Sequence, residues 1–371
     1  MVLLTPGPTP IPPRVQAALA RPMRAHLDPE VLETNRRIQA FLRDLYDPGE
    51  GALVAALAGT GSLGMEAGLA GLTRAGDRVL VLENGAFGAR IAQIARQHGL
   101  EVDVVSAPPG WPVDPEDVAR ALRARRYRIV AVVHGETSTG VRNPVEAIGA
   151  LARAHGALYM VDAVTTAGML PFSMQRIGAD YAFTGSQKCL SAPPGLAPFA
   201  LSARARAALG TGRVWYTDFT RIAAYWEQHA YHHTAPVPLH YALEEALSVV
   251  FEEGLEARRA RAERLYRAAA SVLEDLGFRV FAREGARLET VLVVTVPEFL
   301  DEAELRRRLR AAGVVVAGGI GPTAGRVLRL GLMGEGAREA HYRAFFRALE
   351  QALGRAGLEE AFAGALEAPV R

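Results

Sequence analysis

Short β-rich runs alternate with helical patterns between about residues 50 and 200, and this alternation limits the possible folds more than any other feature. Segments with a period near 3.6 residues, such as "GARIAQIARQHG" and "VEAIGALARAHG", separate five apolar runs: "ALVAAL", "RVLVLE", "YRIVAVV", "ALYMVDAV" and "DYAFTG". Strands separated by helices indicate a mainly parallel sheet. We therefore predict an α/β domain with a mainly parallel sheet and helices on both faces.

The C-terminal third shows a second cycle of strand and helix patterns. A long arginine-rich helix pattern from about 240 to 275 precedes it, and the run "EARRARAERLYRAAA" in that pattern is typical of a solvated helix face. "LETVLVVTVP", "EAELRRRLRAAG", "VVVAGG" and "RVLRLGL" then indicate a smaller α+β domain. We predict an extended Pro-rich N-terminal arm over 1–13, a large domain over 14–253 and a small domain over 254–371.

Composition excludes several classes of partner. The 371-residue chain has a net charge of +2 with acids and bases interspersed, so it has no basic stripe for nucleic acid. No apolar run approaches the roughly 20 residues of a membrane helix. The single cysteine, Cys189, rules out an internal disulfide and suits a reducing, cytoplasmic location. We predict no metal site, because the clustered histidines lack ligand spacing: His229, His232, His233 and His240.

Lys188 is the only lysine in the chain, since 41 of the 42 basic residues are arginines. One interpretation is incidental: a GC-rich coding sequence or heat adaptation favours arginine, and one lysine escaped the bias. The other is chemical. A guanidinium stays protonated and is a poor nucleophile, whereas a lysine amine can lose its proton and condense with a carbonyl.

Two further features fit a carbonyl cofactor that carries a phosphate. In "GTGS" a turn between a predicted strand and helix would present Thr60, Gly61 and Ser62 to a phosphate at the positive helix end. Asp162 ends the run "LYMVD", as a helix cap or as a functional acid. Together with Lys188 these residues fit pyridoxal phosphate, in which Lys188 forms an imine and Asp162 keeps the pyridine nitrogen protonated.

Motifs along nearly the whole chain resemble those of class V (fold type I) pyridoxal-phosphate aminotransferases, most closely the alanine–glyoxylate and serine–pyruvate aminotransferases. The motifs occur in the family's order: "TPGPTPIPPRV", "GTGSLGMEA", "NGAFGAR", "HGETSTGV", "VDAVTTAG", "GSQKCLSAPPG", "YHHTAPV" and "GGIGPTAGRVLRLGLMG". The resemblance implies a homodimer with shared active sites, in which the N-terminal arm lies over the neighbouring subunit.

The resemblance also implies a role for each motif residue. Lys188 and Asp162 would be catalytic, and Phe87 stands where many relatives stack a tryptophan on the cofactor ring. Ser62 stands where some relatives carry histidine. The remaining implied contacts are Thr137 near the phenolic oxygen, Thr60, Gly61, Ser62 and Gln187 at the phosphate, Tyr231 and Thr234 from the neighbouring subunit, and Arg329 and Gly7 at the substrate.

These assignments predict a transaminase that moves an amino group from alanine or serine to glyoxylate or pyruvate. We find no second arginine in a family motif for the distal carboxylate of aspartate or glutamate. Two alternatives remain: another pyridoxal-phosphate enzyme of this fold, such as a lyase or desulfurase, and a non-catalytic cofactor-binding subunit. Cys189 adjoins Lys188 and cannot readily reach a substrate's sulfur, so we interpret it as a packed thiol.

Overall fold

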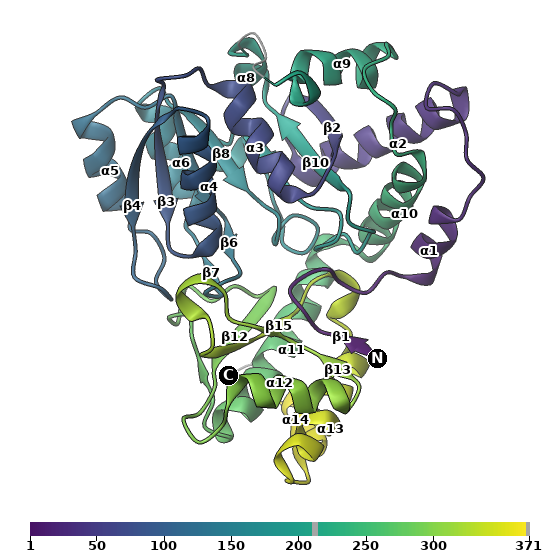
Figure 1. Ribbon diagram of the computed structural model, residues 1–371, viewed down its shortest axis with the longest axis vertical. Coiled ribbons are helices and arrows are strands. Elements are labelled where there is room, and N and C mark those ends of the chain that lie inside the picture. Colours follow the sequence, from purple (N-terminus) through teal and green to yellow (C-terminus); the bar gives the residue numbers. More distant parts are fainter. Residues whose placement is uncertain (210–213, 369–371) are drawn as a thin grey trace.

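A computed structural model describes residues 1–209 and 214–368. It shows a larger part built around a seven-stranded sheet and a smaller C-terminal part built around a four-stranded sheet (Figure 1). Within these residues, no helix is both long and apolar enough to cross a membrane.

A seven-stranded sheet forms the large part of the molecule. Its order is β2-β10-β9-β8-β5-β3-β4, and only β10 runs antiparallel to its neighbours. The prediction of a mainly parallel sheet is therefore confirmed. Its strands are β2 (Leu53–Ala58), β3 (Arg78–Glu83), β4 (Glu101–Ser106), β5 (Ile129–Val133), β8 (Leu158–Asp162), β9 (Tyr181–Phe183) and β10 (Leu196–Leu201).

Helices cover both faces of this sheet, as right-handed crossovers between parallel strands require. One group comprises α3 (Gly61–Leu72) and α4 (Ala86–Gln97), and the opposite group comprises α5 (Pro115–Ala124), α6 (Val145–Ala154) and α7 (Met174–Ile177) (Figure 1). A third group packs beside β2 and β10: α1 (Pro13–Leu19), α2 (Pro29–Tyr46), α9 (Phe219–Gln228) and α10 (Val237–Glu253). The remaining elements here are α8 (Ala203–Ala207) and the hairpin of β6 (Gly135–Glu136) and β7 (Val141–Arg142).

The C-terminal part is the smaller α+β unit that the sequence predicts. A four-stranded antiparallel sheet has the order β11-β12-β15-β14 and shares one hydrophobic core with four helices. The strands are β11 (Arg279–Val280), β12 (Val291–Thr295), β14 (Ala317–Gly318) and β15 (Val327–Gly331); the helices are α11 (Leu255–Asp275), α12 (Glu302–Ala311), α13 (Glu339–Leu353) and α14 (Leu358–Glu367).

The arginine-rich pattern expected as one helix from about 240 to 275 is two helices. Gly254 separates α10 from α11 and has φ of 83°, a left-handed conformation that other residues rarely adopt. Each side of this break contributes to a different hydrophobic core. We therefore propose the domain boundary at 253/254.

The N-terminal arm packs against its own chain. β1 (Val2–Leu3) pairs in parallel with β13 (Val314–Val315), so the arm begins as a strand rather than as an irregular segment. The Gly331 N–H donates to the Leu4 carbonyl at 2.7 Å, and the following prolines carry the chain toward Lys188. A contact between this arm and a neighbouring subunit stays a prediction.

Candidate active site

Lys188 lies in the turn between β9 and β10, where its amine is largely buried. Its Nζ donates to the Pro6 carbonyl at 2.5 Å. Burial lowers the pKa of Lys188 to about 8, and the positive charges of Arg329 and Arg90 act in the same direction. An amine with this pKa is neutral in an appreciable fraction of molecules near neutral pH, as nucleophilic attack on a carbonyl requires.

The N-terminal arm fixes the backbone of the Lys188 turn. The Thr9 N–H donates to the Gln187 carbonyl at 3.0 Å, and the Thr9 hydroxyl donates to the Lys188 carbonyl at 3.0 Å. Gly7 has φ of 107°, and a Cβ there would lie 2.6 Å from Lys188 Nζ. Only glycine permits this close approach, so Gly7 and Lys188 lie side by side in the structure. The implied role of Gly7 at the substrate stays a prediction.

Asp162 ends β8 and its side chain is 3% exposed. Its Oδ1 accepts from the Val164 N–H at 2.9 Å, and no donor among the described residues meets Oδ2. Burial raises the pKa of Asp162 to about 7. A protonated ring nitrogen placed at the free oxygen would favour the ionised carboxylate, so the site suits a pyridinium partner.

The N-terminus of α3 adjoins both of these turns. In the described part of the chain, the Gly61 and Ser62 N–H groups have no acceptor, which leaves donors for an anion. A Cβ on Gly61 would lie 2.9 Å from a Val164 methyl and 3.9 Å from Gly185 Cα. The helix end therefore lies between the Asp162 turn and the Lys188 turn.

Gln187 and Thr137 have polar atoms without partners in the described chain. Gln187 Oε1 is buried with no hydrogen bond. The buried Thr137 hydroxyl has no described partner either, while the Thr137 carbonyl accepts from Arg329. Unsatisfied buried groups are costly. The Thr137 hydroxyl can donate to a phenolic oxygen of a cofactor, whereas Gln187 Oε1 is an acceptor, so only the NH₂ group of the Gln187 amide can donate to a phosphate.

Glu136 orients the segment that carries Phe87, a role the sequence analysis did not assign. This fully buried carboxylate accepts from the Phe87 N–H at 3.0 Å and from the Gly88 N–H at 3.2 Å, at the start of α4. Ser138 donates to its other oxygen. The only sequence signal for Glu136 is its position in "HGETSTG", next to Thr137.

Arg90, in the motif "NGAFGAR", is a second arginine near the site besides Arg329. It lies 4.9 Å above the Phe87 ring and donates to Ser62 Oγ at 3.3 Å. Its charge influences both Asp162 and Lys188. Its side chain meets the phosphate seat, so we assign it to that seat and not to a substrate carboxylate.

Arg329 projects from β15 and is 8% exposed. Its Nε donates to the Gly318 carbonyl at 2.7 Å and Nη1 to the Thr137 carbonyl at 3.4 Å. Among residues 1–209 and 214–368, no carboxylate forms an ion pair with this guanidinium. Burial lowers the pKa of Arg329, and within the described chain only the charge of Glu136, which forms no ion pair with it, acts in the opposite direction. A buried guanidinium without an ion-pair partner is costly, so the site suits an anionic ligand.

Arg258 binds the backbone of the turn that carries Lys188. It belongs to the run "EARRARAERLYRAAA", which was expected to be a solvated helix face. That expectation is wrong at this position, because Arg258 is almost fully buried. It donates to the Cys189 carbonyl at 2.7 Å and the Gly168 carbonyl at 2.6 Å, and pairs with Glu253 at 2.9 Å. No sequence signal distinguished it from the neighbouring arginines.

The two residues expected to serve a neighbouring subunit lie on the surface. Tyr231 is 64% exposed and its ring lies 5.3 Å from that of His26, while Thr234 is also exposed. No described contact joins either residue to Lys188 of the same chain.

Comparison with known proteins identifies the family. The profile of the family described as aminotransferase class-V matches residues 53–333. This chain belongs to the class V aminotransferases. The (S)-ureidoglycine–glyoxylate transaminase of Bacillus subtilis (strain 168) is 33% identical over 96% of this chain and 92% of its own length, and the structure of that enzyme superposes with a TM-score of 0.95 over 99% and 98% of the two chains.

Two other solved structures are also similar. The alanine–glyoxylate aminotransferase of Nostoc sp. is 38% identical, with a TM-score of 0.92 over 95% of each chain. The pyridoxamine–pyruvate aminotransferase of Mesorhizobium loti is 30% identical, with a TM-score of 0.92 over 99% of this chain and 97% of that one. Membership in this aminotransferase family implies pyridoxal phosphate as the cofactor, and the groups without described partners at Asp162, Thr137 and the α3 end fit it.

Proposed function

We propose that this class V aminotransferase moves an amino group from alanine or serine to glyoxylate or pyruvate. The relatives named above act on glyoxylate or pyruvate by their descriptions, which supports a small acceptor. The observation that carries the proposal is the buried guanidinium of Arg329, which lacks a carboxylate partner in the described chain although it lies close enough to lower the pKa of Lys188. A substrate carboxylate supplies that partner.

The proposed roles follow from the chemistry of each side chain. Bound pyridoxal phosphate supplies an electron sink. Lys188 would hold the cofactor and, as a free amine, remove and return the proton on the substrate Cα. Asp162 would hold a proton at the pyridine nitrogen, and the α3 end with Gln187 would bind the phosphate. Arg329 would meet the substrate carboxylate through two parallel hydrogen bonds and so orient the Cα–H bond.

The arm favours a small donor. The Pro6 carbonyl accepts a hydrogen bond from Lys188 Nζ. The backbone at Gly7 lies so close to the Lys188 side chain that no side chain would fit at position 7. Both contacts limit the room on this side of the amine. Neither a desulfurase nor a sulfur-accepting lyase is favoured, because the only thiol, Cys189, is fully buried and burial raises its pKa to about 12.

Replacing Arg329 tests the substrate assignment. In Arg329→Lys we expect kcat/KM for alanine with glyoxylate to fall by about tenfold or more, because a point-charge ammonium loses the two-bond geometry. A panel of donors and acceptors should be assayed with wild type, Arg329→Lys and the surface control Arg120→Lys, whose arginine is 73% exposed in its side chain. An unimpaired variant, or aspartate with 2-oxoglutarate as the best pair, would contradict the assignment.

We further propose a homodimer in which Tyr231 and Thr234 complete the neighbour's site. Their exposure in the single chain supports it. Mixing Lys188→Ala with Tyr231→Ala subunits gives heterodimers in which one of the two sites is intact. Random exchange should therefore restore about a quarter of wild-type activity. Absence of recovery, with exchange verified by native mass spectrometry, would count against shared sites.

A further inference from the structure

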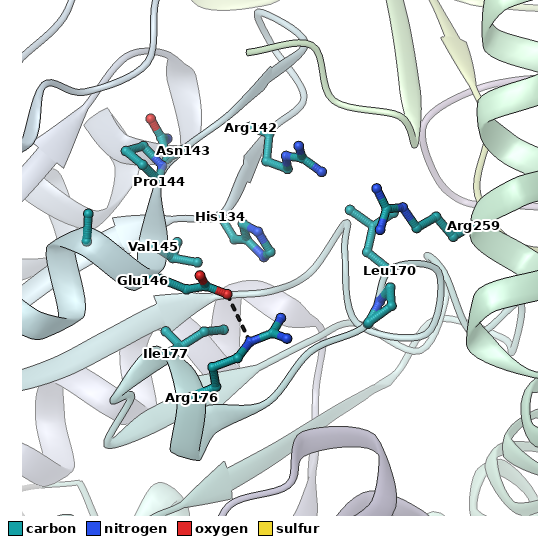
Figure 2. Close-up of a pocket in the computed structure, with 12 residues that line it drawn as sticks. His134, Arg142, Asn143, Pro144, Val145, Glu146, Leu170, Arg176, Ile177 and Arg259 are labelled. Carbon is teal, nitrogen blue, oxygen red and sulfur yellow. Dashed lines mark ion pairs between the residues drawn. The ribbon is translucent and has the colours of Figure 1, made fainter. Parts of the chain in front are cut away.

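A cavity of about 450 Å³ opens on the side of the large sheet that carries α6 and α7. His134 lies at its centre, just after β5, and Arg142 of β7, Arg176 of α7 and Arg259 of α11 surround it (Figure 2). Neither Lys188 nor Arg329 lines this cavity. Its volume lies within the range of about 300–1,000 Å³ that is typical of small-molecule sites.

His134 presents an unused hydrogen-bond donor to the cavity. The side chain is 7% exposed, and its Nδ1 is buried with no partner in the described chain. Burial lowers the pKa of His134 to about 3, and the charge of Arg142 acts in the same direction, so the ring is neutral. Because Nδ1 is fully buried, Nε2 is the ring nitrogen that can reach a ligand in the cavity. We assign the single ring hydrogen to Nε2, which makes that atom a donor. A neutral imidazole of this kind suits an acceptor ligand.

The N-terminus of α6 opens on the same space. Its N-cap residue, Pro144, provides no side-chain cap, and the Val145 N–H donates to the Asn143 carbonyl. The next two N–H groups, of Glu146 and Ala147, have no acceptor within the described residues. Free N–H groups at the start of a ten-residue helix attract anions.

The three arginines are paired with carboxylates but retain unused N–H groups. Arg142 contacts Glu289 at 2.5 Å through Nη1, and Arg259 contacts Glu263 at 2.7 Å through Nε. Each pair occupies only part of a guanidinium that has five donors. The third pair, Arg176 with Glu146 at 2.9 Å, is more than half exposed on both sides, and such surface pairs contribute little stability. The Glu146 carboxylate can therefore turn away from an incoming anion.

We propose that this cavity binds a small oxyanion, a carboxylate or phosphate group, separately from the aminotransferase site. Arg142 and Arg259 provide charge-assisted hydrogen bonds, and His134 Nε2 with the α6 N–H groups completes the donor set. The ligand class follows from the donors that face the cavity: the guanidinium N–H groups of Arg142 and Arg259, the α6 N–H groups and His134 Nε2. The unpartnered acceptors nearby, His134 Nδ1 and Glu289 Oε2, are buried, and Glu289 does not line the cavity.

Calorimetric titration of the holoenzyme tests this site with two probes, inorganic phosphate and malonate. Saturating the protein with pyridoxal phosphate keeps the probes from the cofactor's own phosphate seat. We expect at least one probe to bind with a Kd below about 1 mM. Arg142→Gln and Arg259→Gln should each weaken that binding about tenfold, because each removes a charged donor. Arg347→Gln, a surface change on α13, should leave it unchanged.

The preferred probe identifies the source of the oxyanion. Binding in Arg329→Gln should persist, since that arginine belongs to the substrate site. Three results would overturn the proposal: saturable binding of neither probe, equal binding in both cavity variants and wild type, or binding that disappears in Arg329→Gln. The outcome is independent of whether the aminotransferase assignment holds, because no turnover is measured.

Discussion

Replacing Lys188 with arginine will abolish covalent attachment of the cofactor. A guanidinium cannot form an imine with the cofactor's aldehyde, while it conserves charge at a site where burial is almost complete. The purified variant should lose the visible absorbance band of the bound cofactor, and borohydride treatment should leave no pyridoxyl group on any peptide. Wild type treated in the same way should carry one group per chain, on the peptide that contains Lys188.

Because the chain has no other lysine, a control variant can carry a single lysine at a different place. Lys188→Arg combined with Arg120→Lys restores one lysine on the surface, far from the turn between β9 and β10. That lysine should stay unmodified. A borohydride-stable adduct in either variant would show that attachment does not depend on Lys188.

Replacing Asp162 with asparagine should preserve some cofactor binding but slow turnover by at least about a hundredfold. Asparagine has nearly the same shape, and its oxygen can still accept from the Val164 N–H. It lacks the charge that would hold a proton on the pyridine nitrogen. Single-turnover rates and cofactor content should be measured together, with the half-buried Asp103→Asn on β4 as control.

A near-normal rate in Asp162→Asn with normal cofactor content would show that this acid is structural. Loss of cofactor together with loss of cooperative thermal unfolding would report a folding defect. Asp103→Asn should keep wild-type turnover, since Asp103 lies on the edge strand β4, where it pairs with Arg125 and accepts from the Tyr127 hydroxyl, and an asparagine oxygen can still accept that bond.

Periodicity in the sequence predicted the parallel part of the large sheet because each strand there is a nearly continuous apolar run bounded by polar turns. It did not yield β4, whose residues are mostly half-exposed at the sheet edge, nor the antiparallel β10. The break at Gly254 was also missed within the helical pattern. The positive φ of Gly254 ends one helix before the next begins, and the spacing of apolar residues around it gives no sign of this break.

Candidate site residues in the turns that follow strands could be proposed from the sequence, because each residue type can perform only a few chemical roles at such a place. Lys188, Asp162 and Gly61 are of this kind. Residues that act by fixing backbone could not: Glu136 holds the Phe87 segment, and Arg258 holds the carbonyl of Cys189. Their side chains look like ordinary surface charges in the sequence, and only burial among the described residues reveals what they contact.

One measurement tests the central claim, that this chain transfers amino groups through Lys188, most directly. Holoenzyme should be mixed with excess alanine and no 2-oxo acid, and the pyruvate formed should be counted by mass spectrometry. A transaminase retains the amino group after one half-reaction, so we predict about one pyruvate per subunit and then no more until glyoxylate is added. Continuous release of product without an acceptor would indicate a lyase, and no product with either alanine or serine would contradict the account.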